Sequence, residues 1–474
     1  MPRSFIHRIT TAAALTLTLT ATVTSPSPAS DEVTPPPQAR PIVLTGATVH
    51  PVSGADLADA QVLFDGGRIR AIGRNLALPP NTQVIDVRGK HVYPGLVATD
   101  TVLGLVEISS VRATVDTREV GAINPNARAE VSINPDSELL SVARTNGVLT
   151  ALSAPQGGSG TLVSGTSALV KLDGWTWEDM TLRAPVGLHI RWPQLAINDD
   201  PRFPKSPADQ RKDAEKQLRQ IKDTFDTARA YLKARRSGDK SHEIDLRWEA
   251  MIPVLDGKIP VFVHADEVKQ IQSALAWAEA EKLSLVLVGA TDAWRVAARL
   301  KERNIPVIVS PVMRLPLRRS DPYDAPYTNP AKLQAAGVRF ALSTDSDDAH
   351  LARNLPYQAA MAASFGLPKE EALKAITLYP AQILGLGDRL GSLEVGKDAT
   401  VIVTDGDPLE ITTHVELAFI QGRAIDLGNR QWRLYRKYQQ KYEQQKRSPA
   451  IRAGEATAPA RPTASTSAAP PAAP

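Results

Sequence analysis

The pattern of apolar and polar positions separates both ends of the chain from its middle. Near the N-terminal end, the segments IVLTGATVH (42–50), AQVLFDGGRIRAIG (60–73) and TQVIDVRGKHVY (82–93) alternate apolar and polar residues between Gly and Asp turns. GSLEVGKDATVIVTDGD (391–407) and VELAFIQGRAID (415–426) do the same near the other end. This period of two predicts strands. Two half-sheets from opposite ends predict one composite β-sandwich, built from residues 41–93 and 389–428.

The middle of the chain alternates short apolar runs with helical patterns. The candidate strands are rich in Val, Ile and Leu, as buried parallel strands are, and lie at 147–152, 186–190, 259–265, 283–290, 305–310 and 338–345. Helical patterns over 267–282 and 293–304 separate some of them, which gives repeated βα units. We predict an α/β fold, a (β/α)8 TIM-like barrel over residues 94–388, since such barrels take about 250 residues. The alternative, a doubly wound sheet, lacks a G-x-G-x-x-G after its first strand.

A long helix is predicted inside the barrel region. It begins at Ser206 as N-cap, with Pro207 in the first helical position and Asp209 closing a capping box, and it ends before Gly238. Apolar residues recur along it at spacings of three and four. We expect an insertion packed on the outside of the barrel, while a lid or a partner-binding helix is the alternative. A second helix is expected at 429–447.

Both termini differ in composition from the rest. Basic residues precede the uncharged run ITTAAALTLTLTATVT, and Ser27 and Ala29 suit the last positions before a cleavage site. Residues 1–29 are therefore predicted to be a signal peptide for export to a bacterial periplasm. The alternative, an anchor helix, would need about 20 apolar residues. Residues 30–40 form a Pro-rich linker, and residues 448–474 form an Ala- and Pro-rich tail that cannot bury enough surface to order itself.

Composition excludes several classes of function. The chain has no cysteine, so disulfides, thiolate nucleophiles and Cys-ligated metals are ruled out. Its 43% hydrophobic and 22% charged residues are ordinary for a globular protein, and its net charge is only +4. We therefore expect no nucleic-acid partner, and no membrane span once the signal peptide is removed.

Three motifs resemble one family. They are GKHVYPGLV (89–97), FALSTDSD (340–347) and the long segment from LPKEEALKAIT to VIVTDGDPL (367–409). Together they are similar to the amidohydrolase superfamily, in particular its imidazolonepropionase-like and prolidase-like branch. The resemblance implies a distorted barrel with a composite β-sandwich, and hydrolysis of C–N bonds in cyclic amides, dipeptides or related molecules.

The resemblance also implies a metal site at the barrel mouth. In the family, a His-x-His pair, a carboxylated Lys, two further His and an Asp bind divalent metals, which lower the pKa of bound water towards about 7 for attack. The corresponding positions here are Asp100, Val102, His189, His264, Gly289 and Asp345. Val102 and Gly289 cannot ligate through a side chain, so the binuclear centre is expected to be incomplete. Asp345 is the expected catalytic proton acceptor.

A smaller site remains open. Two imidazoles and two carboxylates suit a single zinc or other divalent ion, and the candidate ligands are Asp100, His189, His264 and Asp345. Asp266 or Glu267 is the expected acceptor that would orient His264. The competing interpretation gives each residue a structural role, with no metal bound.

Two functions therefore remain open for this chain. The first is an exported hydrolase of C–N bonds with an altered metal site and a small amide or peptide-like substrate. The second is a catalytically inactive relative, a pseudoenzyme, that binds a ligand, forms a homo-oligomer or partners an active paralogue. Arg314, Arg318 and Arg319 after the seventh strand either meet an anionic substrate or lie in a solvated loop.

Overall fold

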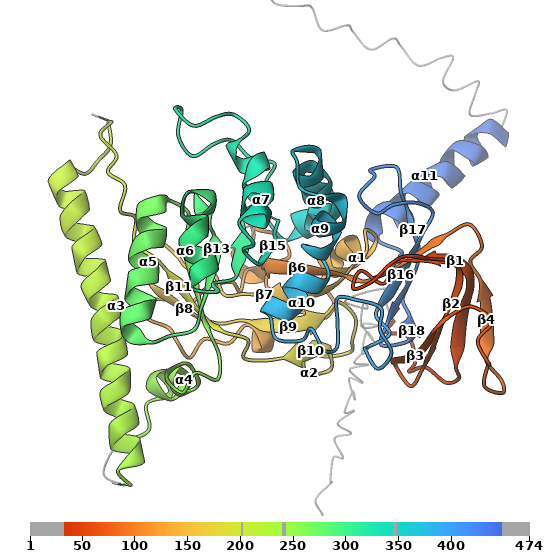
Figure 1. Ribbon diagram of the computed structural model, residues 1–474, viewed down its shortest axis with the longest axis horizontal. Coiled ribbons are helices and arrows are strands. Elements are labelled where there is room, and N and C mark those ends of the chain that lie inside the picture. The colour runs from red at the N-terminus through yellow and green to blue at the C-terminus, as the bar shows by residue number, and fades with distance from the viewer. Residues whose placement is uncertain (1–32, 201, 239–242, 345–347, 448–474) are drawn as a thin grey trace, which may run out of the picture.

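The structure is a computed structural model that describes residues 33–200, 202–238, 243–344 and 348–447. Its strands form three hydrogen-bonded sheets. Figure 1 places a β-rich domain at one end of the molecule and the helix α3 at the other. The helices are α1 (Glu138–Arg144), α2 (Trp177–Met180), α3 (Pro207–Arg236), α4 (Leu246–Leu255), α5 (Val268–Glu281), α6 (Ala297–Glu302), α7 (Ala325–Ala335), α8 (Leu355–Ser364), α9 (Lys369–Lys374), α10 (Leu378–Ile383) and α11 (Arg430–Arg447).

One sheet joins the two ends of the chain. Its strands are β1 (Ile42–Val49), β2 (Leu57–Asp65), β3 (Arg68–Gly73), β4 (Gln83–Asp86), β5 (His91–Pro94), β16 (Val401–Thr404), β17 (Val415–Ile420) and β18 (Arg423–Ala424). The order is β18-β17-β16-β5-β1-β2-β3, and β4 also pairs with β1. β16 from the C-terminal part pairs antiparallel with β5 from the N-terminal part. The two predicted half-sheets therefore form one sheet.

This sheet curls over its own core. Phe64 on β2 and Phe419 on β17 belong to strands far apart in the sheet order, yet their ring centroids lie 5.1 Å apart in an edge-to-face contact. Both side chains are buried in a cluster that includes Leu44 and Val401. The amide of Ile69 donates to the carbonyl of Lys397 at 2.9 Å, which ties β3 to the segment before β16. In the structure, the predicted sandwich is therefore a single sheet that curls over its own core.

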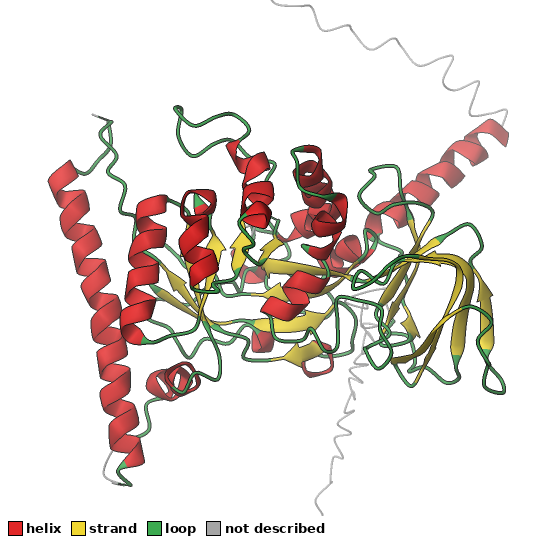
Figure 2. Ribbon diagram, in the orientation of Figure 1, coloured by secondary structure: helices red, strands yellow, loops and turns green. Residues whose placement is uncertain are grey.

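The central α/β region contains the other two sheets. One has the order β10-β9-β7-β6, with β6 (Leu96–Thr101), β7 (Val148–Ser153), β9 (Ala168–Lys171) and β10 (Thr181–Arg183). The other has the order β15-β14-β13-β12-β11-β8, with β8 (Val163–Thr166), β11 (Leu188–Arg191), β12 (Val261–Ala265), β13 (Leu285–Gly289), β14 (Val307–Val309) and β15 (Phe340–Leu342). β11 to β15 are all parallel, as predicted from their continuous apolar runs. Figure 2 shows the helices that follow β12 to β15 along one side of these strands.

These two sheets share an interior although their ladders do not close into a cylinder. Val97 on β6 and Leu152 on β7 pack in one buried cluster with Phe262 on β12 and Val288 on β13. At one seam, the hydroxyl of Thr99 donates to the carbonyl of Leu342 at 3.2 Å. The architecture is an α/β barrel-like domain, made of two arcs around one core.

The long predicted helix is confirmed. α3 begins after Ser206, whose hydroxyl accepts from the amide of Asp209 at 3.1 Å, and it extends to Arg236. Its buried face meets α5, where Phe225 contacts Trp277 edge-to-face at 5.1 Å. It therefore packs outside the strands, as expected of an insertion. Among the described helices, none combines the length and the apolar character needed to cross a bilayer.

Candidate functional site

A cavity of about 740 Å³ lies at the carboxyl ends of the central strands. Six strands in turn contribute a lining residue at or just beyond this end: Asp100, Arg191, His264, Gly289, Ser310 and Ser343. The loop after β14 forms a further wall through Met313, Arg314 and Leu315. Carboxyl ends of parallel strands are where barrel-type proteins assemble their sites. This cavity is therefore the candidate site.

A chain of three side chains runs from the cavity into the core. The guanidinium of Arg191 lies 2.9 Å from Nδ1 of His264, and Nε2 of His264 lies 2.9 Å from Nδ1 of His189. Arginine only donates hydrogen bonds, so Nδ1 of His264 must be the acceptor. In the neutral ring, the proton of His264 is then on Nε2 and donates to His189. His189 in turn carries its proton on Nε2, a buried atom without a hydrogen-bond partner among the described residues.

Burial keeps both imidazoles neutral. His189 is fully buried and stacks on Phe262 at 4.9 Å between ring centroids. Removal from water, together with the charge of Arg191, lowers the pKa of His189 to about 3. The same causes, with the addition of His189, hold the pKa of His264 well below its usual value. The proton positions assigned to the neutral rings therefore describe this chain at neutral pH.

Asp266 fills the space beside Gly289. One oxygen of Asp266, Oδ1, accepts from the hydroxyl of Thr291 at 2.5 Å and from that of Ser310 at 3.3 Å. Gly289 has a φ of +88°, and a Cβ built there would lie 3.0 Å from this oxygen. A larger residue at position 289 would thus meet both backbone strain and the carboxylate. Glycine is the residue that fits.

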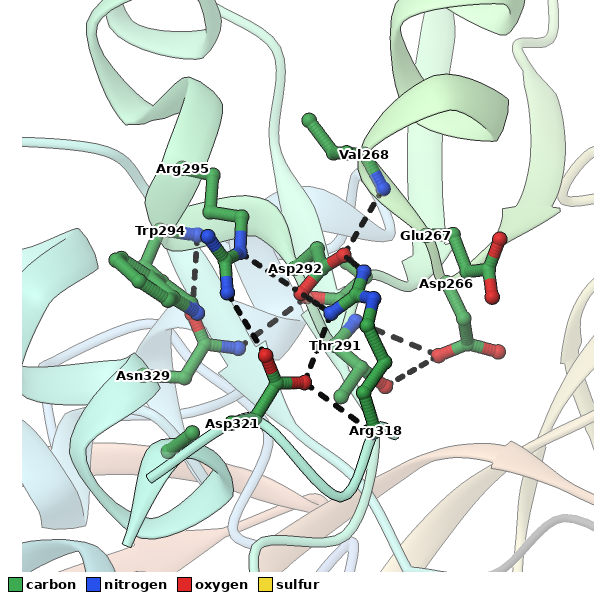
Figure 3. Close-up of polar contacts among 12 residues, drawn as sticks. Asp266, Glu267, Val268, Thr291, Asp292, Trp294, Arg295, Arg318, Asp321 and Asn329 are labelled. Atoms are coloured by element: carbon green, nitrogen blue, oxygen red, sulfur yellow. Dashed lines mark hydrogen bonds and ion pairs between the residues drawn. The ribbon is translucent and has the colours of Figure 1, made fainter. Parts of the chain in front are cut away.

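An ion cluster beneath the cavity wall holds the loop after β14 (Figure 3). Asp292 binds Arg318 through both of its oxygens, and it also accepts from Arg295 at 3.2 Å and from the amide of Val268 at 3.1 Å. Asp321 bridges the two arginines at 2.8 and 3.0 Å. Burial alone would raise the pKa of Asp292, but the hydrogen bonds from Arg318 and Val268 outweigh it and lower that pKa. Arg318 therefore anchors this loop through ion pairs to Asp292 and Asp321, with its side chain still 34% exposed.

The structure brings together some of the sequence-predicted residues. Asp100 and His264 line the same cavity, and His189 contacts His264 from the side of the buried core. Val102 is 1% exposed and belongs to the hydrophobic core. Asp345 lies outside the described residues, so its predicted role as ligand and proton acceptor stays a prediction.

Two features of the site differ from the sequence analysis. Neither of the two predicted acceptors for His264 binds it. Asp266 lies just after the end of β12 and accepts a hydrogen bond from Thr291. Glu267 caps the start of α5. Arg191 binds His264 instead, and its backbone pairs with that residue in the β11–β12 register. The signal for Arg191 was its place two residues after His189, on the same face of a strand.

The donor set of the described residues does not fit a zinc ion. A zinc-bound imidazole offers a lone pair to the metal. Arg191 donates a hydrogen bond to the Nδ1 lone pair of His264. Nε2 of His264 carries a proton and donates it in a hydrogen bond to the Nδ1 lone pair of His189, so neither lone pair is available to a metal. Consistent with this, no group of three or more His, Asp or Glu side chains in the described ranges is placed to hold a metal.

Comparisons with known proteins identify relatives. The sequence model of the Amidohydrolase family matches residues 262–426. An amidohydrolase, tasK, of Hapsidospora irregularis is 22% identical over 426 residues, which cover 80% of this chain and 42% of that protein. An imidazolonepropionase of Maricaulis maris is 30% identical over 171 residues, 35% of this chain and 41% of that enzyme. This chain thus spans about two fifths of the length of both relatives.

A solved structure covers more of the fold. The crystal structure of an amidohydrolase from Thermotoga maritima MSB8 matches with a TM-score of 0.71 and 28% sequence identity. The match covers 81% of this chain and 99% of that one. The match therefore extends over most of this chain.

Proposed function

This chain belongs to the amidohydrolase superfamily, and we propose that it is a ligand-binding relative that does not use the superfamily's two-metal hydrolysis. One observation carries the proposal: Arg191 donates to Nδ1 of His264 and so removes the lone pair that a metal would need. A guanidinium beside that nitrogen also repels a divalent cation. The cavity remains, and its size suits a small molecule.

The ligand that we propose is a small amide or peptide-like molecule. The similarity to imidazolonepropionases supports a cyclic or amide-containing compound. The cavity offers charged groups of both signs, among them Asp266 and Arg314. One oxygen of Asp266 is held by Thr291 and Ser310, which fixes the direction of the carboxylate. A fixed carboxylate is suited to orient an N–H group of a ligand.

Metal analysis of protein purified without a His tag tests the proposal. After dialysis against zinc, we expect far less than one zinc per chain in the wild type. Arg191→Met frees Nδ1 of His264 and should raise the zinc content, while Arg314→Met, another cavity arginine, should not. A full equivalent of zinc in the wild type that His264→Ala removes would favour the hydrolase instead.

A thermal-shift screen with cyclic amides and dipeptides, followed by mass spectrometry, tests the binding function. We expect compounds that raise Tm and are recovered uncleaved. Cleavage by the wild type that is lost in His264→Ala would contradict the proposal.

We further propose that the two central sheets enclose one distorted (β/α)8 barrel, supported by their shared interior cluster. This proposal keeps the predicted boundaries, which are a barrel over 94–388 and flanking β-rich segments over 41–93 and 389–428. We also propose that the protein is exported to the periplasm after removal of residues 1–29.

A further inference from the structure

The C-terminal helix α11 stands away from the fold (Figure 1). It is held at its first turn, where the amide of Trp432 donates to Asn429 at 2.9 Å and Arg433 pairs with Glu138 at 2.7 Å. From Arg430 to Lys446, every residue except Arg433 and Gln445 is exposed. Helices in proteins gain most of their stability by packing an apolar face. The described part of the chain provides no such packing for most of α11.

The helix nevertheless has two distinct faces. Four aromatic side chains, spaced by three or four residues, lie on one face and are about half exposed: Trp432 49%, Tyr435 54%, Tyr438 49% and Tyr442 57%. The rest of the helix surface carries basic residues that include Arg436, Lys437 and Lys441. Nζ of Lys441 lies 5.8 Å from the ring centroid of Tyr438, at the border of the two faces.

The charge of α11 restricts what can cover it. The sequence RQWRLYRKYQQKYEQQKR holds seven basic residues and one acidic residue, Glu443. A second copy packed on the aromatic face would place two helices side by side, each with seven basic residues and one acidic residue, which is unfavourable. A negatively charged surface would be attracted. The occupant of this face is therefore anionic.

The residue types on the apolar face indicate a lipid surface. A helix that docks in a protein groove uses aliphatic anchors at helical spacing, and here Leu434 is the only aliphatic residue between Arg430 and Arg447. Trp and Tyr have an apolar ring and a polar atom, and together with Lys and Arg they are typical of helices that lie in the headgroup layer. We propose that α11 docks this protein on an anionic membrane surface, parallel to the membrane plane.

Co-sedimentation of the full chain with vesicles tests the proposal. We expect binding to vesicles of phosphatidylcholine and phosphatidylglycerol in equal parts at low salt, little binding to phosphatidylcholine alone, and release by high salt. The triple variant R436Q/K437Q/K441Q should bind about a hundredfold more weakly, since each basic side chain near such a surface contributes about a factor of five. The matched control is K212Q/K216Q/R219Q on the exposed face of α3, which should bind like the wild type.

The aromatic face has its own test. Y435S/Y438S should also weaken binding, with circular dichroism used to check that the fold is kept. Brominated lipid should quench part of the tryptophan fluorescence of the bound protein, and W432F should lose that part. Equal sedimentation with neutral vesicles would overturn the proposal, as would an unchanged R436Q/K437Q/K441Q variant. A lipid-independent dimer that Y435S/Y438S dissociates, without vesicle binding, would assign the face to a second copy and also overturn it.

Discussion

The described part of the chain contains two histidine pairs with the same spacing and with neighbours of opposite charge. His189 and His264 lie in the central strands, with 2.9 Å between ring nitrogens, and Arg191 binds the pair at one end. His50 and His91 lie in the β-rich domain at the same 2.9 Å. At the end of this second pair, Asp56 lies 2.8 Å from Nδ1 of His50.

The charged residue at the end sets the direction of the hydrogen bonds. Asp56 accepts a hydrogen bond from Nδ1 of His50, so Nε2 of the neutral ring accepts one from Nδ1 of His91. The neutral ring of His91 then ends the chain with a lone pair on Nε2. Arg191 donates instead, so its chain ends with the N–H of His189. Histidine pairs of equal geometry are therefore not equally able to bind a cation. The identity of the adjacent charged residue decides it.

The largest expected difference between the pairs is in acid. His189 and His264 have pKa values far below the usual value. Below about pH 6.5 the unfolded chain therefore binds two protons that the folded chain does not bind. Their stabilising contribution is complete above about pH 6.5 and is lost as the pH falls towards the lowered folded-state pKa, which is about 3 for His189. The slope is about 2.7 kcal/mol per pH unit at most. Urea unfolding across this range measures the slope.

The control for this prediction compares slopes. H189Q/H264Q should flatten the profile below about pH 6.5. For His50, burial lowers the pKa and the charge of Asp56 opposes it, so H50Q should change the slope less. Equal slopes in the wild type, H189Q/H264Q and H50Q would contradict the lowered pKa values of His189 and His264.

Sequence patterns located the strands and α3 because burial and capping act locally. The apolar run VFVHA places β12 where the structure has it, and Ser206 and Asp209 fix the start of α3. The roles of the site residues depend on register between strands, which the sequence does not display. Arg191 faces His264 only because β11 and β12 pair in one particular register. Gly289 was identified as a missing ligand, but the carboxylate that crowds it comes from another strand end.

His264→Ala should reduce the unfolding free energy by about 3 kcal/mol, because it removes two hydrogen bonds, one from Arg191 and one to the buried ring of His189. His91→Ala in the other pair should cost about 1 kcal/mol, since this side chain is only partly buried. Urea denaturation at neutral pH measures both. If both variants lost the same unfolding free energy, the hydrogen bond from Arg191 would not stabilise the His189–His264 pair.

Gly289→Ala should cost about 2 kcal/mol, because alanine at a positive φ costs about 1 kcal/mol and the contact with Asp266 adds to it. Gly160→Ala is the matched control, with a φ of +85° and nothing within 4 Å of the added Cβ. It should cost only the backbone strain. If both variants lost the same free energy, the carboxylate of Asp266 would be free to move away.

The smallest change in stability is expected for Asp56→Asn, which should alter the unfolding free energy by about 0.5 kcal/mol because Asp56 is 59% exposed. Its effect on titration tests the comparison most directly. Burial already lowers the pKa of His50 and Asp56 raises it, so loss of the carboxylate should lower that pKa further. Arg191→Met should do the reverse and raise the pKa of His264, because the guanidinium disfavours the charged ring. NMR titration of the imidazole protons measures both shifts. Shifts of the same sign would mean that burial, and not the charge at the end of each pair, determines how these histidines behave.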